Sequence, residues 1–218
     1  IEKGAKVNAR DKGGRTPLYY AFWEDNADIV ELLIEKGADE NFDARGLDED
    51  LFLNLHAACV GHTDIAKLLI ETGFDVNAKD KWGRTPLYRA SEGCHIGIAK
   101  LLIEKGAEVN VRCTYIEEPY CCEHSELRED TPLHRAIYND SVNIAKLLIE
   151  KGADVNAING RGATPLSLAY QRSFLDVTKM LINRGAKDNQ TLKLALANGD
   201  TDLVKLLVER GGEVTLHF

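Results

Sequence analysis

Internal repetition constrains this chain more than any other feature, because most of the sequence aligns with edited copies of residues 131–157, TPLHRAIYNDSVNIAKLLIEKGADVNA. In this segment Thr131 suits a helix N-cap, and Pro132 follows at the first helical position, where a missing N–H costs nothing. Apolar residues then recur at helical spacing on both sides of a polar break, and Gly152 follows the second run where a left-handed C-cap is expected. The segment therefore predicts two short antiparallel helices and a loop.

Neither predicted helix is long enough to be stable alone, and each carries an apolar stripe that nothing inside the unit is large enough to cover. The unit must therefore stack on neighbours. The positions equivalent to Thr131 are Thr16, Phe52, Thr85, Thr164 and Gln190. The matching positions of the second helices are Ile29, Ile65, Ile98, Ile144, Val177 and Leu203. Two of the five intervals are 33 residues, and the others differ only in the connecting loop.

Two short motifs recur in register through the chain. The tripeptide TPL occupies 16–18, 85–87, 131–133 and 164–166, and in the third copy His134 and Ala136 extend it. The tripeptides GAD and GAE occupy 37–39, 106–108 and 152–154. These residues resemble the ankyrin repeat family, whose unit is about 33 residues long with a T-P-L-H-x-A signature. The resemblance covers essentially the whole chain and implies an all-α solenoid of stacked helix-turn-helix units with β-hairpin fingers.

A solenoid grows by adding repeats, so we expect one continuous domain over residues 1–218. Residues 1–9 align with the end of a truncated repeat, which predicts at least one further helix pair upstream. The remaining boundaries are predicted at 10–41, 42–77, 78–110, 111–156 with a loop insertion, 157–189, and 190–218 as the C-terminal cap.

Three repeats depart from the pattern. The second lacks TPL, and the acidic run 48–50 is an alternative helix start; in the third, Cys94 replaces the glycine expected between the helices. The last has polar residues where a terminal repeat needs a polar outer face, namely Lys193, Asn198, Asp200, Lys205 and Glu209.

Charge and composition exclude several classes of function. The net charge is -8 and the pI about 5.3, which argues against a nucleic-acid partner. No apolar run is long enough to span a membrane, and the first residues, IEKGAKVNAR, contain no signal-peptide core. The five cysteines do not resemble a disulfide framework, so we expect a cytoplasmic protein. The wording LLIEKGADVNA is similar to ankyrin proteins of intracellular bacteria, large viruses and animals, which hints at a host-directed effector in a host cytosol.

The resemblance implies that a partner binds across the fingers and the first helices, on a concave face. Carried over to this sequence, the predicted partner-binding residues are Lys12, Arg15, Trp23, Lys81, Trp82, Arg84, Tyr138, Arg161 and Arg172. Trp, Tyr and Arg most often dominate binding energy at interfaces. We therefore predict Trp82 and Trp23 as anchors, with Tyr138, Arg84 and Arg15 beside them. The alternative is that Trp23 packs against its neighbours Tyr20 or Phe22, and that Lys81 and Arg84 are ordinary solvated residues.

Basic residues also gather in the fingers, where such a stripe steers an acidic partner. They are Arg10, Lys12, Arg15, Lys79, Lys81, Arg84, Arg112 and Arg161.

The insertion before Thr131 is the one segment that the repeat does not explain. Cys113, Cys121, Cys122 and His124 lie within twelve residues of one another and suggest Zn²⁺ ligands. However, no C-x-x-C pair is present and adjacent cysteines do not easily share one ion, so we predict no metal and no cofactor. The alternative is a long finger whose tyrosines, at 115 and 120, are available for contact.

The chain contains no phosphate-binding loop, no H-E-x-x-H and no G-x-S-x-G, so catalysis is not supported. We expect a non-catalytic protein-interaction module that is monomeric as a fragment. One alternative is the targeting or regulatory segment of a larger enzyme, secreted effector or channel. A third hypothesis is a metal- or redox-responsive binder that uses the insertion.

Overall fold

A computed structural model describes residues 5–38, 61–80, 83–117 and 126–210. These residues group into two compact units, which are described separately. Unit 1 contains residues 5–38, 61–80 and 85–107, and unit 2 contains residues 83–84, 108–117 and 126–210.

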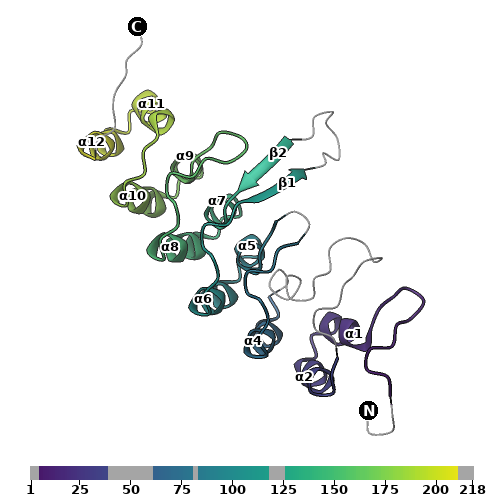
Figure 1. Ribbon diagram of the computed structural model, residues 1–218. Coiled ribbons are helices and arrows are strands. Elements are labelled where there is room, and N and C mark those ends of the chain that lie inside the picture. The colour runs from purple at the N-terminus through teal and green to yellow at the C-terminus, as the bar shows by residue number, and fades with distance from the viewer. Residues whose placement is uncertain (1–4, 39–60, 81–82, 118–125, 211–218) are drawn as a thin grey trace. The chain divides into compact units, whose positions relative to one another are not determined.

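Unit 1 is built from helices that follow one another along the chain. They are α1 (Pro17–Trp23), α2 (Ala27–Glu35), α4 (Thr63–Glu71), α5 (Pro86–Glu92) and α6 (Ile96–Glu104). Helices α1 and α2 pack as one pair and α5 and α6 as another, and α4 contacts both α2 and α6 (Figure 1).

Unit 2 begins with a β-hairpin and continues as three helix pairs. Its elements are β1 (Cys113–Glu117), β2 (Glu126–Asp130), α7 (Pro132–Tyr138), α8 (Val142–Glu150), α9 (Pro165–Gln171), α10 (Leu175–Asn183), α11 (Asn189–Ala197) and α12 (Thr201–Glu209). The first helices of the pairs form one row and the second helices another (Figure 1). The predicted all-α solenoid with hairpin fingers is confirmed.

The first helices start where the TPL motif predicts. Thr16, Thr85, Thr131 and Thr164 are extended N-cap residues, and each hydroxyl accepts a hydrogen bond from the N–H three residues later, with proline at the first helical position. Helix α11 lacks the motif and starts one residue before the predicted boundary. There Asp188 caps the helix by accepting from the N–H groups of Gln190 and Thr191.

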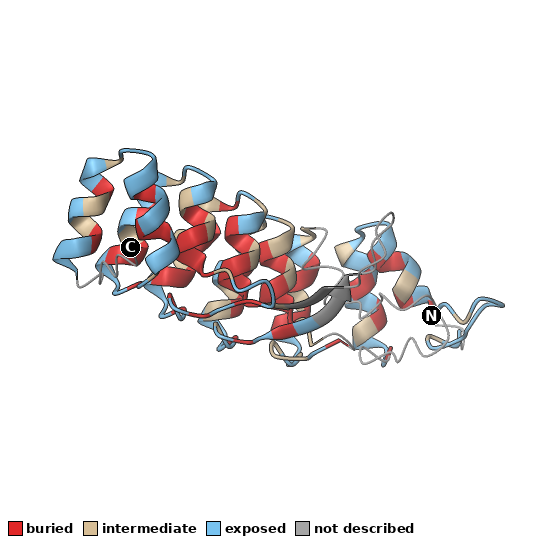
Figure 2. Ribbon diagram, turned by 90° about the horizontal axis from the view of Figure 1, so that it is seen from above, coloured by how far each residue is buried: buried red, intermediate tan, exposed pale blue. Residues whose placement is uncertain are grey.

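The core lies between the two rows of helices, where red buried positions face one another in Figure 2. Each described first helix contributes a leucine and an alanine three residues later, as in Leu133 and Ala136. Small alanines let neighbouring helices approach closely, and the second helices fill the remaining space with aliphatic side chains such as Ile144 and Leu148.

Four asparagines in the loops between repeats each join one repeat to the next. In unit 1, Asn8 and Asn77 donate through Nδ2 to the carbonyls of Gly37 and Gly106, at 3.0 and 3.2 Å. In unit 2, the equivalent Asn110 and Asn156 donate to the carbonyls of Gly152 and Gly185, both at 3.2 Å. The acceptor glycines have positive φ, as predicted for Gly152.

The inserted segment forms an antiparallel hairpin, paired in register from Cys113 with Asp130 to Glu117 with Glu126. Its base is fixed by Arg112, whose Nη1 donates to the carbonyl of Ile158 at 3.2 Å and lies 3.7 Å from Glu129 Oε2. On the opposite strand, Asp130 accepts from Asn159 Nδ2 at 2.9 Å. The insertion is therefore an extended finger at its base, as one of the two predictions had it.

The structure describes only part of the chain ends and of the second repeat. The acidic helix start predicted at 48–50 lies outside the described residues. In the last repeat, Lys193, Asn198, Lys205 and Glu209 are exposed and Asp200 is half-buried, as predicted. Leu196 and Val208 are also exposed, so this surface is less polar than its sequence suggested.

Candidate protein-binding surface

The last turn of each first helix places side chains at the surface. Trp23, the final residue of α1, is 59% exposed, and Tyr138, the final residue of α7, is 40% exposed. The buried residues of these helices lie at Leu18, Ala21 and Phe22 in α1, a spacing that turns position 23 away from the core. Each exposed ring stands in a cluster of aromatic and basic side chains, one cluster in each unit.

The unit 1 aromatic cluster consists of Arg15, Tyr19, Tyr20 and Trp23. The rings of Tyr19 and Trp23 stack with centroids 6.3 Å apart and planes 10° from parallel, and Tyr20 meets Tyr19 edge-on at 5.4 Å. The Arg15 guanidinium carbon lies 5.4 Å from the Tyr19 ring centroid, within the range of a cation–π interaction. Tyr19 and Trp23, four residues apart, share one face of α1, and Arg15, just before the N-cap, extends them into a ladder of three side chains.

Asp11 ties this cluster to the preceding finger. Its Oδ2 accepts from Tyr20 Oη at 2.7 Å, and its Oδ1 accepts from the N–H groups of Gly13 and Arg15 at 2.8 and 2.9 Å. These hydrogen bonds, that of Tyr20 first, lower the pKa of the Asp11 carboxyl. The finger therefore presents its basic residues in a fixed relation to the ladder, although Asp11 is fully exposed.

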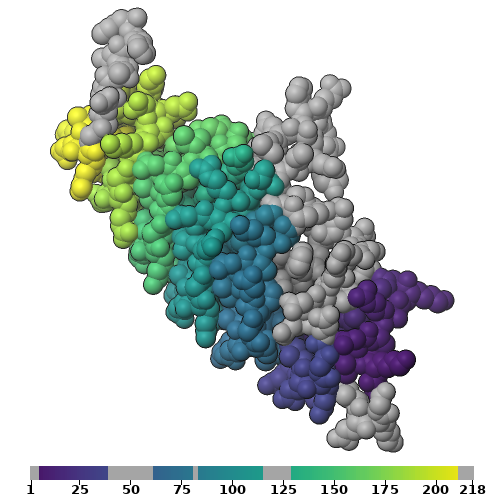
Figure 3. Space-filling view, in the orientation of Figure 1, coloured from purple at the N-terminus to yellow at the C-terminus, as the bar shows by residue number. Residues whose placement is uncertain are grey.

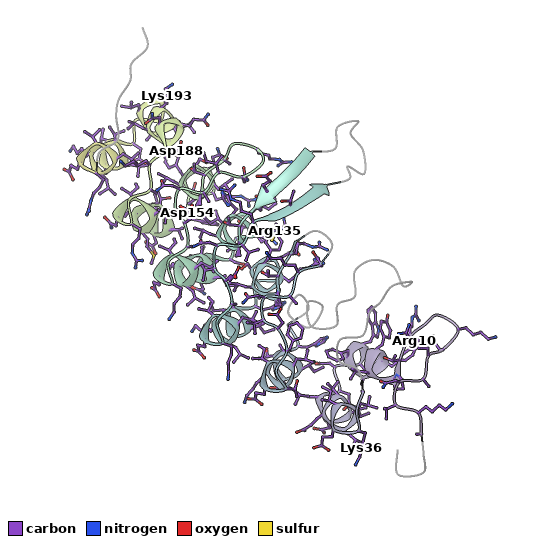
Figure 4. The ribbon with its side chains drawn as sticks, in the orientation of Figure 1. Arg10, Lys36, Arg135, Asp154, Asp188 and Lys193 are labelled. Carbon is purple, nitrogen blue, oxygen red and sulfur yellow. The ribbon has the colours of Figure 1, made fainter. Side chains whose placement is uncertain are left out.

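The unit 2 aromatic cluster consists of Arg135, Tyr138, Asp140 and Arg172. Guanidinium carbons of Arg135 and Arg172 lie 5.7 and 5.1 Å from the Tyr138 ring centroid. Arg172, just past the end of α9, also donates from Nη1 to Asp140 Oδ1 at 2.7 Å. Arg172 thus links two successive repeats across the surface. Arg135, which belongs to the same cluster, is labelled on α7 in Figure 4.

The structure brings together four of the predicted site residues, in two pairs. Arg15 joins Trp23 in unit 1, and Tyr138 joins Arg172 in unit 2. Lys12 and Arg161 are exposed finger residues outside both clusters, and Arg84 is half-buried. Trp82 and Lys81 lie outside the described residues.

The predicted basic stripe is partly neutralised where it is described. Asp11 accepts a hydrogen bond from the backbone N–H of Arg15, and Glu129 Oε2 lies 3.7 Å from Arg112 Nη1. Exposed charge pairs contribute little to stability, so these contacts mainly orient the side chains.

Several cluster residues were not predicted from the sequence. Two of them could have been found from the sequence. Tyr19 lies midway between Arg15 and Trp23, four residues from each, and Asp11 precedes the turn of the finger. Arg135 and Asp140 give no such signal, because their role depends on contact with the next repeat.

Three histidines predicted to be structural are so placed. His134 is buried and bridges Thr131 Oγ1, at 2.8 Å, and the Ala163 carbonyl, at 3.2 Å. His62 and His95 lie at the turns between paired helices. Among the described residues no group of His, Cys, Asp or Glu is arranged to hold a metal ion; Cys121, Cys122 and His124 lie outside them, and Cys113 is a buried strand residue.

A stack of helix pairs with capped Thr-Pro starts and an asparagine–glycine ladder defines a helical repeat protein of the interaction-scaffold class. Family models described as ankyrin repeats match residues 46–113 and 116–191, in a three-copy model, and residues 1–34, in a many-copy model. The chain belongs to the ankyrin repeat family, a general protein-interaction module. In the described part of the chain, no helix is long and apolar enough to cross a membrane.

Curated proteins with similar segments are diverse. The chain is 40% identical over 90 residues to the E3 ubiquitin-protein ligase Ufd4 of Drosophila melanogaster, covering 41% of this chain and 3% of that protein. It is 33% identical over 89 residues to human ankyrin repeat and SOCS box protein 3, covering 40% and 17%. It is 32% identical over 121 residues to the NF-kappa-B inhibitor cactus of Drosophila melanogaster, covering 42% and 24%. The chain therefore spans less than a quarter of the length of each of these relatives.

Proposed function

We propose that this chain is a non-catalytic binding module that holds a partner protein through its first-helix surface and fingers. The observation that carries the proposal is the exposure of Trp23 within a ladder already fixed by Arg15 and Tyr19. An exposed tryptophan contributes little to folding, whereas Trp, Tyr and Arg dominate the energy of protein interfaces. Because Tyr19 and Arg15 already restrict the indole, a partner loses little further side-chain entropy on binding.

The unit 2 aromatic cluster supports the same role. Tyr138 stands between two guanidinium groups, and Arg172 is held by Asp140, so the ring and its cations form a preorganised polar rim around an apolar surface. Such a surface suits a partner with a flat apolar or aromatic anchor and nearby carboxylates, which bind Arg bidentately. Arg84 and Arg161 of unit 2, and Lys12 in the finger of unit 1, are further basic side chains that can contact a partner.

A second candidate is a targeting or regulatory segment of a larger protein. It is favoured by the coverage of the relatives, since the matching segments make up 3% of Ufd4 and 24% of cactus. Both candidates use the same surface, and they differ in what the surrounding protein does. A cytoplasmic location and a role as a host-directed effector fit either one.

The proposal is tested by capturing partners from a lysate of the source cell and identifying them by mass spectrometry. The double variant Trp23→Ala/Tyr138→Ala removes both exposed rings. The matched control Ile29→Ala/Val208→Ala removes comparably exposed apolar side chains from the second helices. Circular dichroism confirms that each variant is folded.

We expect a partner that is retained by the parent chain and the control and lost from Trp23→Ala/Tyr138→Ala. Loss of the same partner from the control, with retention by the aromatic double variant, contradicts the assignment of the surface. Trp82→Ala, tested in parallel, establishes whether the tryptophan outside the described residues belongs to the same site.

A further inference from the structure

The turns between paired helices follow one another along each unit, and a groove here means the space between two successive turns. Each described turn has one residue in the left-handed region, and the N-cap of the second helix follows it. In unit 1 a histidine at the N-cap lies against the left-handed residue of the preceding repeat. His62 Nδ1 is 2.8 Å from Asp25 Oδ1, and the ring of His95 lies so close to Gly61 that a Cβ there would meet it at 2.5–3.0 Å. These two imidazoles occupy the space between successive turns.

The last groove of unit 2 contains a much smaller side chain. Its left-handed residue is Ser173, with φ 59°, and the N-cap that faces it is Asp200. Asp is shorter than His, and a cavity of about 420 Å³ opens here between the turns of α9–α10 and α11–α12. In the space-filling view these four helices, green to yellow, form one continuous surface (Figure 3).

The lining of this cavity combines apolar and polar side chains. Leu175 and Leu194 are exposed walls, and the Tyr170 hydroxyl at the edge accepts from Asn198 Nδ2 at 3.1 Å. The hydroxyl of Thr178 is buried, in a side chain that is 1% exposed, and has no hydrogen-bond partner among the described residues. A buried hydroxyl without a partner is unfavourable, so this part of the cavity suits a polar group from outside.

Asp200 is the one charged residue among those that line the cavity. Its Oδ1 accepts from the N–H of Leu203 at 3.2 Å, which fixes the carboxylate at the start of α12. Two nearby charged side chains are engaged with the preceding repeat instead, because Arg172 pairs with Asp140, and Asp176 accepts from Lys146 at 3.0 Å. The cavity therefore carries a net negative charge, within a chain of net charge -8.

We propose that this cavity, the Asp200 pocket, binds the side chain of an arginine or lysine from a partner protein. The methylene groups of such a side chain lie between Leu175 and Leu194, and its cationic head donates to Asp200 and to the Thr178 hydroxyl. In the equivalent groove of unit 1, a nitrogen also lies against a carboxylate, because His62 Nδ1 is 2.8 Å from Asp25 Oδ1. An acidic side chain is repelled by Asp200, and an apolar one leaves the buried Thr178 hydroxyl without a partner. The Asp200 pocket is separate from both aromatic clusters and does not depend on them.

The test is a nuclear magnetic resonance titration of the full chain with Nα-acetyl-arginine methylamide, with Nα-acetyl-norleucine methylamide as the apolar probe. Asp200→Asn removes the charge and keeps an N-cap residue, so the fold is retained. Asp202→Asn is the matched control, because Asp202 is an exposed carboxylate in the first turn of the same helix. Asp200→His fills the groove as in unit 1.

We expect saturable shifts of the amides of Ser173, Thr178, Leu194 and Asn198 with the arginine probe, and at least about tenfold weaker binding of norleucine and of arginine to Asp200→Asn. Asp202→Asn binds within about twofold of the parent. Asp200→His abolishes binding and raises the Tm. The proposal is overturned if the arginine probe causes no saturable shift, if norleucine binds as tightly as arginine, or if the two Asn variants lose affinity equally.

Discussion

Trp23 combines exposure with a fixed position. It is 59% exposed, yet its ring stacks on Tyr19, and Tyr19 in turn contacts the Arg15 guanidinium. The sequence suggested Tyr20 or Phe22 as packing partners for Trp23. Phe22 is instead buried in the core, and the Tyr20 hydroxyl donates to Asp11. A side chain that is both exposed and held in place suits the role of an anchor for a binding partner.

Cys94 occupies a backbone conformation that glycine adopts more easily. Its φ is 63°, and glycines stand at the equivalent turns at Gly61 and Gly199. A side chain in the left-handed region costs about 1–2 kcal/mol, part of which is offset because glycine makes the unfolded chain more flexible. We expect Cys94→Gly to raise the free energy of unfolding by about 0.5–1 kcal/mol in urea titrations. Cys94→Ala is the control, and an equal gain from alanine would show that strain is not the cause.

At the scale of the element, the helix starts were predictable and the contacts between repeats were not. Thr131 and Pro132 are local signals that act within one turn, so the starts of α1, α5, α7 and α9 follow from the sequence. The Asp200 pocket depends instead on comparing one turn with its neighbours. An aspartate where His62 and His95 stand is the sequence signal that could have indicated it.

His134 makes the stability of unit 2 dependent on pH. Burial lowers the pKa of its imidazole, although the charge of Asp130 and the carbonyls of Ala163 and Ala157 act in the opposite direction. Since the folded pKa lies below the unfolded value near 6.5, the unfolded chain binds more protons as the pH falls. This stability is fully present above the unfolded pKa and is lost on acidification toward the folded pKa, by at most about 1.4 kcal/mol per pH unit.

We therefore expect urea titrations to show unit 2 unfolding more easily at pH 5.5 than at pH 7.5. His134→Gln lowers stability at both pH values and removes this part of the difference, because glutamine does not titrate. His62→Gln, at a turn in unit 1, leaves the pH dependence of unit 2 unchanged. An unaltered pH dependence in His134→Gln would show that other groups are responsible.

At the scale of the whole molecule, the repeat pattern predicts which apolar residues are buried, but only where a neighbouring repeat covers them. Ile149 of α8 is buried, at 1% exposure, whereas Val208 at the equivalent position of α12 is 46% exposed. The sequence alone does not distinguish these two positions, because coverage depends on the adjacent repeat. The same reason explains why Tyr138 and Arg172 were predicted separately and are found together.

The free energy of unfolding should likewise depend on whether a neighbouring repeat covers the substituted side chain. Ile149→Ala is expected to lower the free energy of unfolding of unit 2 by about 2–5 kcal/mol, through lost burial and a cavity. Val208→Ala is expected to cost about 1 kcal/mol or less, because much of its surface is already in water. Both values are measured by urea unfolding followed by circular dichroism. Equal costs would mean that Val208 is covered in solution.

The most direct test of the binding surface is hydrogen–deuterium exchange on the complex with a captured partner. If the partner binds the first-helix surface and the fingers, exchange is expected to slow at residues 11–24, at residues 135–140 and around Arg172. Little change is expected in the second helices α2, α8 and α10. Protection confined to those second helices would contradict the central claim, because it would place the partner on the opposite row of helices.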